Sequence, residues 1–276
     1  MYFDVKGKKI FASTGGKPFD NGKPCVIFLH GSGLDHTFWG LHARFFAFRN
    51  YSVLCPDLPG HSNSDGPPLK TIEEIADWLN DVVEALDIRD ISIVAHSQGV
   101  LIALEFVSHH PERVRSVSLI ASGLATPVNP ALIDAAENDP DKAVDMMVSW
   151  GFGPAGHFHR GPIPGNSMAA GGRKVLARNA PQALAADLRA NDAYGNGKQA
   201  APKIPRPVQV MVAGKDRMAP KGATDELISH LDSPEVHFFP GTGHMIPLEE
   251  PDKCRDLLKY FIFTHNPASS PVTNRY

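Results

Sequence analysis

The sequence lacks any apolar run long enough to cross a lipid bilayer. Its longest fully apolar stretches, such as Cys25–Leu29, fall far short of the ~20 residues that a membrane-spanning helix requires. The amino terminus has an acid at Asp4 and no uninterrupted apolar core, which argues against a secretory signal peptide. We therefore expect no membrane span and, by default, a cytoplasmic protein.

The sequence also lacks an excess of charge of either sign. Its 27 Lys and Arg residues stand against 30 Asp and Glu residues, a formal net charge of −3, and it has no run of five or more basic residues. This balance gives no sign of a nucleic-acid or acidic-membrane partner. With 42% hydrophobic and 21% charged residues, the composition is that of a globular protein and excludes collagen-like, coiled-coil and wholly disordered chains.

Cysteine is scarce, and its number is odd. The chain has three, Cys25, Cys55 and Cys254, and two of them lie in apolar strand-like runs. Such positions suit a small buried hydrophobic side chain, so a disulfide framework is not indicated. We expect all three cysteines to be reduced and structural.

Short β-branched runs alternate with longer helical patterns, which is typical of a mostly parallel sheet with crossover helices. A helix is expected over 71–87, where Thr71 and Glu74 have capping-box spacing and the apolar residues share one face. The expected strands lie at 4–12 with a turn at Gly7, and at 25–29, 52–55, 91–95, 114–121, 208–213 and 236–239. We therefore predict an α/β fold with a twisted sheet flanked by helices.

The alternation breaks between residues 124 and 203, where no strand-like run occurs and Ala, Gly, Pro and Asn dominate. Helices are expected near 130–150 and 172–190, separated by a Gly- and Pro-rich loop. A linker between two domains is the alternative, but the segment after residue 203 is too short to stand alone. We therefore predict a core of residues 1–123 and 204–265, a helical cap over 124–203 and a loose tail over 266–276.

The most informative stretch is a β-branched strand that passes directly into an apolar helix at Ser97. A turn this tight requires small residues two positions before and after the serine, which here are Ala95 and Gly99, and it exposes the hydroxyl at the sheet edge. The dipole of the following helix favours negative charge on a reacting acyl group. A helix N-cap serine is the alternative interpretation, but the context favours a nucleophile.

A serine nucleophile needs a base and a group that orients the base. Of the thirteen histidines, His244 lies in a Gly-rich loop after the last strand, whereas His237 lies inside that strand and is better explained by packing. Asp216 follows the preceding strand at the same sheet edge, although a turn-forming or helix-capping role is equally compatible with its position. Because the carboxyl ends of parallel strands converge, we predict a site built from Ser97, His244 and Asp216.

A tetrahedral intermediate also needs backbone N–H donors for its oxyanion. Gln98, directly after Ser97, is expected to supply one from the start of its helix. The second is expected from the loop after the strand 25–29, where Ser32 is preferred and Gly33 is the alternative. His30 in the same loop is expected to brace it.

Four blocks of the sequence together resemble the α/β-hydrolase fold family, capped members in particular. In this resemblance Ser97 is the nucleophile, His244 the general base and acid, and Asp216 its partner, in the family's order along the chain. Asp57 matches a structural position. The blocks are His30–Gly33, Pro56–Asp65, Ala95–Gly99, and the pair of 214–216 with 243–244.

The departures from the family pattern narrow the expected chemistry. A serine at position 97 excludes the alkyl-enzyme ester of dehalogenases and epoxide hydrolases, and Ala95 in place of the usual glycine is small enough for the turn. Met245 comes after His244 where carbon–carbon bond hydrolases of the family have Trp, and Ser32 stands where perhydrolase-like members have an aromatic residue. His61 is expected at the rim of the fold, without consequence.

The resemblance thus implies a serine hydrolase of carboxylic esters that works through an acyl-enzyme. A carbon–carbon bond hydrolase, a thioesterase and a non-catalytic ligand-binding protein are the alternatives. Sparse charge near the site favours a neutral small-molecule ester, the apolar residues expected around it favour an apolar acyl group, and no cofactor is expected. No metal is assigned either, since His157 and His159 lack carboxylate neighbours. An apolar pocket is expected from Phe38, Trp39, Met146, Met147, Trp150, Phe152, Met218 and Met245.

Overall fold

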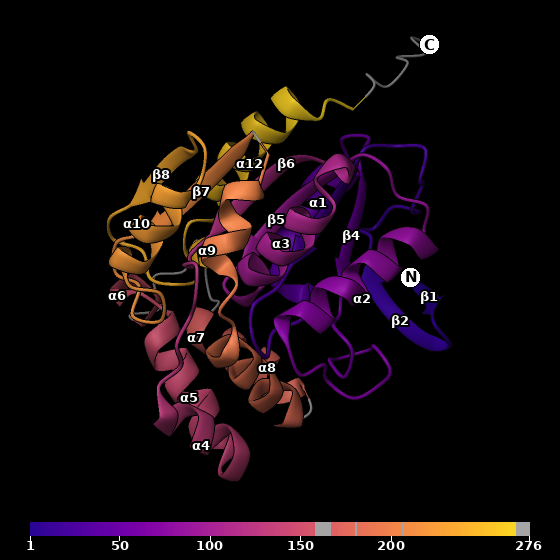
Figure 1. The fold of residues 1–276 in the computed structure, drawn as a ribbon. Coiled ribbons are helices and arrows are strands. Elements are labelled where there is room, and N and C mark those ends of the chain that lie inside the picture. The colour runs from indigo at the N-terminus through magenta and orange to yellow at the C-terminus, as the bar shows by residue number, and fades with distance from the viewer. Residues whose placement is uncertain (158–166, 180, 206, 269–276) are drawn as a thin grey trace.

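A computed structural model of the chain describes residues 1–157, 167–179, 181–205 and 207–268 (Figure 1). The described residues form one eight-stranded sheet with the order β1-β2-β4-β3-β5-β6-β7-β8. The strands are β1 Tyr2–Val5, β2 Lys8–Ser13, β3 Cys25–Leu29, β4 Ser52–Pro56, β5 Ile91–His96, β6 Val114–Ile120, β7 Val208–Ala213 and β8 Glu235–Phe239. The single strand region expected over 4–12 is thus a hairpin that turns at Gly7.

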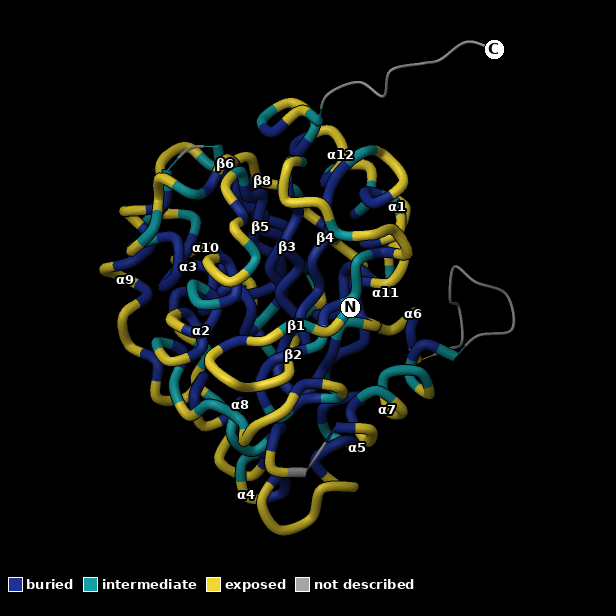
Figure 2. The backbone as a smooth tube through the Cα atoms, turned by 90° about the vertical axis from the view of Figure 1, so that its right-hand side faces the viewer, coloured by how far each residue is buried: buried dark blue, intermediate teal, exposed yellow. Residues whose placement is uncertain are grey.

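The six strands from β4 to β8 in this order are parallel, and only β2 runs in the opposite direction, so its pairings with β1 and β4 are antiparallel. Both faces of the parallel part are covered, so central strands such as β3 are buried at every residue. Figure 2 shows this buried interior beneath an exposed periphery. The mostly parallel sheet that the sequence predicts is confirmed.

Two layers of helices cover the sheet. Cys25, Ile27 and Leu29 of β3 pack in the apolar cluster that includes α2 and α3, whereas Val26 and Phe28 pack in the cluster that includes α1 and α12. This alternation results from the two-residue period of a strand. The helices of the core are α1 Gly40–Ala47, α2 Ile72–Ala85, α3 Gln98–His109, α10 Lys221–His230, α11 Ile246–Glu249 and α12 Pro251–His265, with short turns η1 His36–Trp39 and η2 Pro111–Arg113.

Residues 124–203, which we call the inserted segment, contain no strand among their described residues. The two helices expected near 130–150 and 172–190 are each divided, the first because Pro140 begins a new helix after Asp139, whose backbone is not helical. Figure 1 shows α4, α5, α7 and α8 gathered at one end of the sheet. The elements are α4 Pro130–Asn138, α5 Pro140–Gly151, α6 Pro154–His157, α7 Met168–Arg178, α8 Pro181–Ala193, α9 Gly197–Ala200 and η3 Ala201–Lys203.

Three smaller expectations can be compared with the structure. Cys25, Cys55 and Cys254 are all buried and free, as predicted, and burial raises the pKa of each thiol. Among the described residues, no helix combines the length and apolar character that a membrane crossing needs. The expectation of a loose tail from residue 266 is wrong at its start, because Asn266 is buried and accepts a hydrogen bond from the Tyr51 hydroxyl at 2.8 Å.

Candidate active site

Ser97 occupies a strained turn between β5 and α3. Its φ of 55° and ψ of −121° lie in a region that residues with a side chain rarely adopt. Close contacts leave little room for a side chain at Gly99 after the turn or at Gly31 in the facing loop after β3. A Cβ on Gly99 would lie 2.6 Å from the Leu29 carbonyl oxygen, and one on Gly31 would lie 3.0 Å from the Ser97 Cβ. The chain therefore maintains the strand–turn–helix geometry that the sequence predicts.

His244 and Asp216 form a buried pair at the same end of the sheet. Asp216 lies after β7 and His244 after β8, and the His244 Nδ1 is 2.8 Å from the Asp216 Oδ2. The other carboxylate oxygen accepts hydrogen bonds from the N–H groups of Met218 and Ala219, each at 2.8 Å, which fixes its orientation. Since a carboxylate only accepts, Nδ1 of His244 donates to it, which leaves Nε2 as the nitrogen that can act as a base.

One cavity brings Ser97 and His244 together. It has a volume of about 560 Å³, and Ser32, Trp150 and Met218 also line it. Asp216 lies behind His244, its side chain only 1% exposed. The three residues expected from separate loops therefore meet at one sheet edge.

The two candidate oxyanion residues of the loop after β3 have different surroundings. Ser32 lines the cavity of Ser97, and its Oγ accepts a hydrogen bond from Asn191 Nδ2 at 2.9 Å. The Gly33 N–H instead donates to Asp187 Oδ2 at 2.8 Å. Gln98, the other expected donor, is the first residue of α3 and is fully buried.

His96, next to Ser97, is a part of the site that sequence reasoning missed. Its ring is fully buried, and its Nε2 donates to the His244 main-chain oxygen at 3.0 Å. Burial, together with the neighbouring His244, holds the pKa of His96 well below its usual range. The neutral ring thus fixes the His244 loop. Among thirteen histidines, only its adjacency to Ser97 could have indicated this role.

His61 is not at the rim of the fold, and this expectation is wrong. Its side chain is 1% exposed, and its Nε2 lies 3.0 Å from Oδ2 of Asp187 in α8. His30 braces the neighbouring loop as expected, since its Nε2 accepts a hydrogen bond from the Leu58 N–H at 3.4 Å. Sequence reasoning missed Asp187, because a single aspartate inside a helix gives no signal of its partner.

The expected pocket residues divide among three locations. Trp150 and Met218 line the cavity of Ser97, whereas Phe38, Met147, Phe152 and Met245 line a separate apolar cavity of about 190 Å³ between η1, α5, α7 and α11. Trp39 and Met146 are absent from the lining of both cavities. Trp39 is wrongly assigned to the pocket, because it is fully buried in the core against Phe28 and His42.

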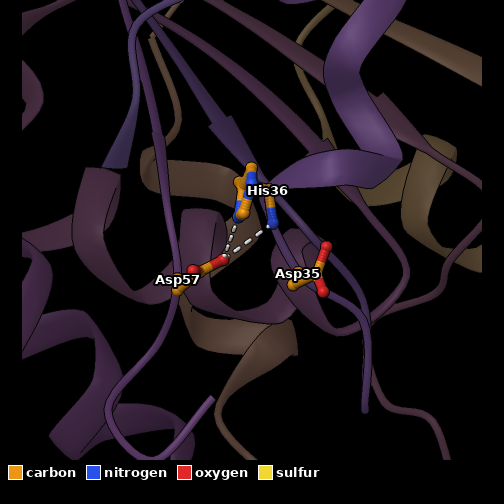
Figure 3. Close-up of side chains that lie close together, drawn as sticks. All are labelled: Asp35, His36 and Asp57. Carbon is orange, nitrogen blue, oxygen red and sulfur yellow. Dashed lines mark hydrogen bonds and ion pairs between the residues drawn. The ribbon is translucent and has the colours of Figure 1, made fainter. Parts of the chain in front are cut away.

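Asp35, His36 and Asp57 form the one group among the described residues with metal-ligand spacing (Figure 3). Their oxygens already have protein donors. Asp35 accepts hydrogen bonds from Thr37 and pairs with Arg178, and Asp57 accepts from His36 and from Asn63. These contacts brace two loops. His159, considered with His157 as a ligand pair, lies outside the described residues.

Comparison with known proteins gives consistent matches over most of the chain. The profile of the Alpha/beta hydrolase family matches residues 26–257. A non-heme chloroperoxidase of Kitasatospora aureofaciens is 27% identical over 268 residues, 88% of this chain and 94% of that protein. A pimeloyl-(acyl-carrier protein) methyl ester esterase of Aromatoleum aromaticum is 24% identical over 256 residues, 86% of this chain and 97% of that protein.

A solved structure supports the same fold. The enol-lactonase from Burkholderia xenovorans superposes with a TM-score of 0.83 at 20% identity, over 95% of this chain and 99% of that chain. Together with the profile match, this likeness confirms the predicted α/β-hydrolase fold. The matched range contains Ser97, Asp216 and His244.

Proposed function

Because the chain belongs to the alpha/beta hydrolase family, we propose that it is a serine hydrolase that cleaves carboxylic esters. The observation that carries this proposal is the His244–Asp216 pair at 2.8 Å, whose histidine lines the same cavity as a serine with a φ of 55°. A helix-capping or packing role would not require all three features. Strain at one residue and a buried oriented histidine are typical of catalytic sites.

In the proposed reaction, the Ser97 Oγ attacks the ester carbonyl carbon while His244 Nε2 accepts the hydroxyl proton. Asp216 stabilises the resulting imidazolium through Nδ1–H. The imidazolium then returns the proton to the leaving alkoxide, which departs as the alcohol. A water molecule, deprotonated by the same nitrogen, cleaves the acyl-enzyme and restores Ser97.

The proposed oxyanion donors are the backbone N–H groups of Gln98 and Ser32. Ser32 is supported over Gly33, because the Gly33 N–H is already bonded to Asp187. Ser32 also lines the Ser97 cavity, and Gln98 begins α3, so the helix dipole adds to its donor. Two fixed donors at this position stabilise the tetrahedral oxyanion.

We further propose that the inserted segment acts as a cap and that the substrate is a small ester with an apolar acyl group. Trp150 and Leu188 of this segment line the cavity of Ser97, and Met147, Met168 and Leu176 of the same segment line the separate cavity, whose side chains are mainly apolar. The relatives named an esterase and an enol-lactonase agree with ester chemistry. Rates on simple esters, acyl-CoA thioesters and vinylogous diketones distinguish the ester hydrolase from a thioesterase or a carbon–carbon bond hydrolase.

Labelling with a fluorophosphonate tests the proposal. Intact mass and peptide mapping are expected to find one adduct on Ser97, and Ser97→Ala is expected to abolish both the adduct and turnover of a short-chain p-nitrophenyl ester. Ser229→Ala, on the exposed side of α10, serves as the matched control and retains both. Failure of the folded wild-type protein to label, or turnover that survives Ser97→Ala, would contradict the proposal.

A further inference from the structure

One face of α8 holds the loop that contains Ser32 and Gly33. Asp187 Oδ2 accepts the Gly33 N–H at 2.8 Å, and one helical turn later Asn191 Nδ2 donates to the Ser32 Oγ at 2.9 Å. Asp187 is 1% exposed and Asn191 is 5% exposed. Residues four apart lie on the same side of a helix, so the two contacts work together.

A third side chain of the inserted segment holds the carbonyl side of the same loop. Asn179, directly after α7, donates its Nδ2 to the carbonyl oxygens of Gly33 at 2.7 Å and Leu34 at 3.0 Å. Its Oδ1 accepts the N–H of Ser62 at 2.8 Å. Gly33 is therefore bonded through both its amide and its carbonyl, which fixes the peptide planes on either side of it.

Asp187 also reaches the second proposed donor. Its main-chain oxygen accepts a hydrogen bond from Nε2 of Gln98 at 3.3 Å. A single residue of α8 thus contacts both segments that supply the proposed oxyanion donors. Asp187 is absent from the lining of the Ser97 cavity, so its effect passes through these segments and not through contact with substrate.

His61 anchors the Asp187 carboxylate. Its Nε2 lies 3.0 Å from Asp187 Oδ2, and its Nδ1 lies 3.1 Å from the carbonyl oxygen of Pro59. Both partners are acceptors, so the protonated ring, with hydrogen on both nitrogens, is the form that satisfies both contacts. Burial alone would lower the pKa of His61, but the charge and hydrogen bond of Asp187 raise it, with help from the Pro59 carbonyl and from Asp57.

We propose that Asp187 is a positioning residue that holds the Ser32–Gly33 loop in the conformation needed to stabilise the oxyanion. This inference rests on the ester-hydrolase function proposed above. By binding the Gly33 N–H, the carboxylate orients the loop so that the Ser32 amide supplies its donor at the cavity. The substrate does not touch Asp187, so the loop geometry changes the stability of the transition state more than it changes substrate binding.

Kinetics of three variants test the inference. Removing one oxyanion donor costs about 10²-fold or more in kcat, so Asp187→Ala is expected to lower kcat by about 100-fold while KM changes by less than about threefold. Asp187→Asn keeps an acceptor for the Gly33 N–H and is expected to recover part of this loss, with kcat about tenfold below wild type. Arg189→Ala is the matched control, because it breaks the exposed ion pair of the same helix with Glu137, and its kcat is expected to stay at the wild-type value.

The rates are expressed per active site titrated with the fluorophosphonate, so that loss of folded protein is not counted as loss of catalysis. If Asp187→Ala does not fold, the near-isosteric Asp187→Asn decides. Wild-type kcat in the variants would overturn the inference and leave the ester-hydrolase function intact. A wild-type protein without Ser97-dependent turnover would overturn the proposed function itself.

Discussion

Two buried histidine–aspartate pairs lie at the same end of the sheet, and they differ in the second ring nitrogen. In the His244–Asp216 pair, Nδ1 binds the carboxylate, and the histidine lines the Ser97 cavity. In the His61–Asp187 pair, both ring nitrogens donate to acceptors within the protein. The distances are similar, at 2.8 and 3.0 Å, so the pair distance does not distinguish them.

The difference teaches that the number of acceptors around the ring decides its role. A histidine that binds one carboxylate through Nδ1 keeps Nε2 available, and this nitrogen can take a proton from a substrate or nucleophile. A histidine with two acceptors satisfies both when it is protonated, and it then orders its neighbours as a buried donor on both sides. The first pair is thus suited to catalysis and the second to holding the loop after β3.

The largest expected effect is on kcat, because of the two pairs only His244–Asp216 is expected to take part in catalysis. His244→Ala is expected to lower kcat by about 10⁴-fold or more, because Ser97 loses its base. His237→Ala is the matched control, since that histidine lies on β8, the strand preceding the His244 loop, and lines neither cavity, and its kcat is expected to remain at the wild-type value. The measurement is steady-state turnover of a p-nitrophenyl ester by folded protein, because the variant also leaves the buried Asp216 carboxylate without its histidine. Unchanged turnover in His244→Ala would contradict the assignment.

The second expected effect is on stability. His61→Gln leaves the Asp187 carboxylate buried without its counter-charge, so the free energy of unfolding is expected to fall by about 3 kcal/mol at pH 6. The pKa of His61 is raised in the folded protein, so its protonation stabilises the fold fully below the unfolded value of 6.5 and is lost as pH rises through the folded value. Urea unfolding at pH 6 and pH 9 is therefore expected to find the difference from wild type smaller at pH 9.

The groups that face His61 are Asp187 of α8, Asp57 after β4 and His30 after β3. His30→Asn is the control, because it removes the titratable ring next to His61 and keeps His61 itself. It is expected to preserve the pH dependence of the free energy of unfolding. A stability difference between wild type and His61→Gln that is the same at both pH values would contradict the charged state of His61.

Most of the fold could be predicted from the sequence, because its strands and turns depend on local patterns of residues. The β-branched runs led to the strands to within a few residues, and the small residues around Ser97 indicated the tight turn. The helix boundaries in the inserted segment were less predictable. Pro140 lies within a continuous helix-like pattern. The structure shows that one helix ends before Asp139, whose backbone is not helical, and that the next begins at Pro140.

Contacts between distant segments were the part that the sequence could not supply. Asp187 lies 126 residues from His61 and 154 from Gly33, and no periodicity links positions so far apart. Trp39 was assigned to the pocket for a similar reason, since an aromatic residue after a loop has the same pattern whether it points into a cavity or into the core. Ser97, Asp216 and His244 were easier to bring together, because each comes after a parallel strand and the strand ends share one edge.

His36 and Asp57 form a third histidine–aspartate pair, and its loss is expected to have the smallest effect on stability. The His36 ring is 16% exposed, and Asp57 keeps three other hydrogen bonds, from the His36 N–H, the Asn63 N–H and the Asn63 side chain, when the ring is removed. His36→Gln is therefore expected to lower the free energy of unfolding by only about 1 kcal/mol in urea and to leave kcat within about twofold of wild type. If the free energy of unfolding fell as much as in His61→Gln, two explanations of the difference between the pairs would be wrong. These are the hydrogen-bond donors that remain on the carboxylate and the partial exposure of the histidine.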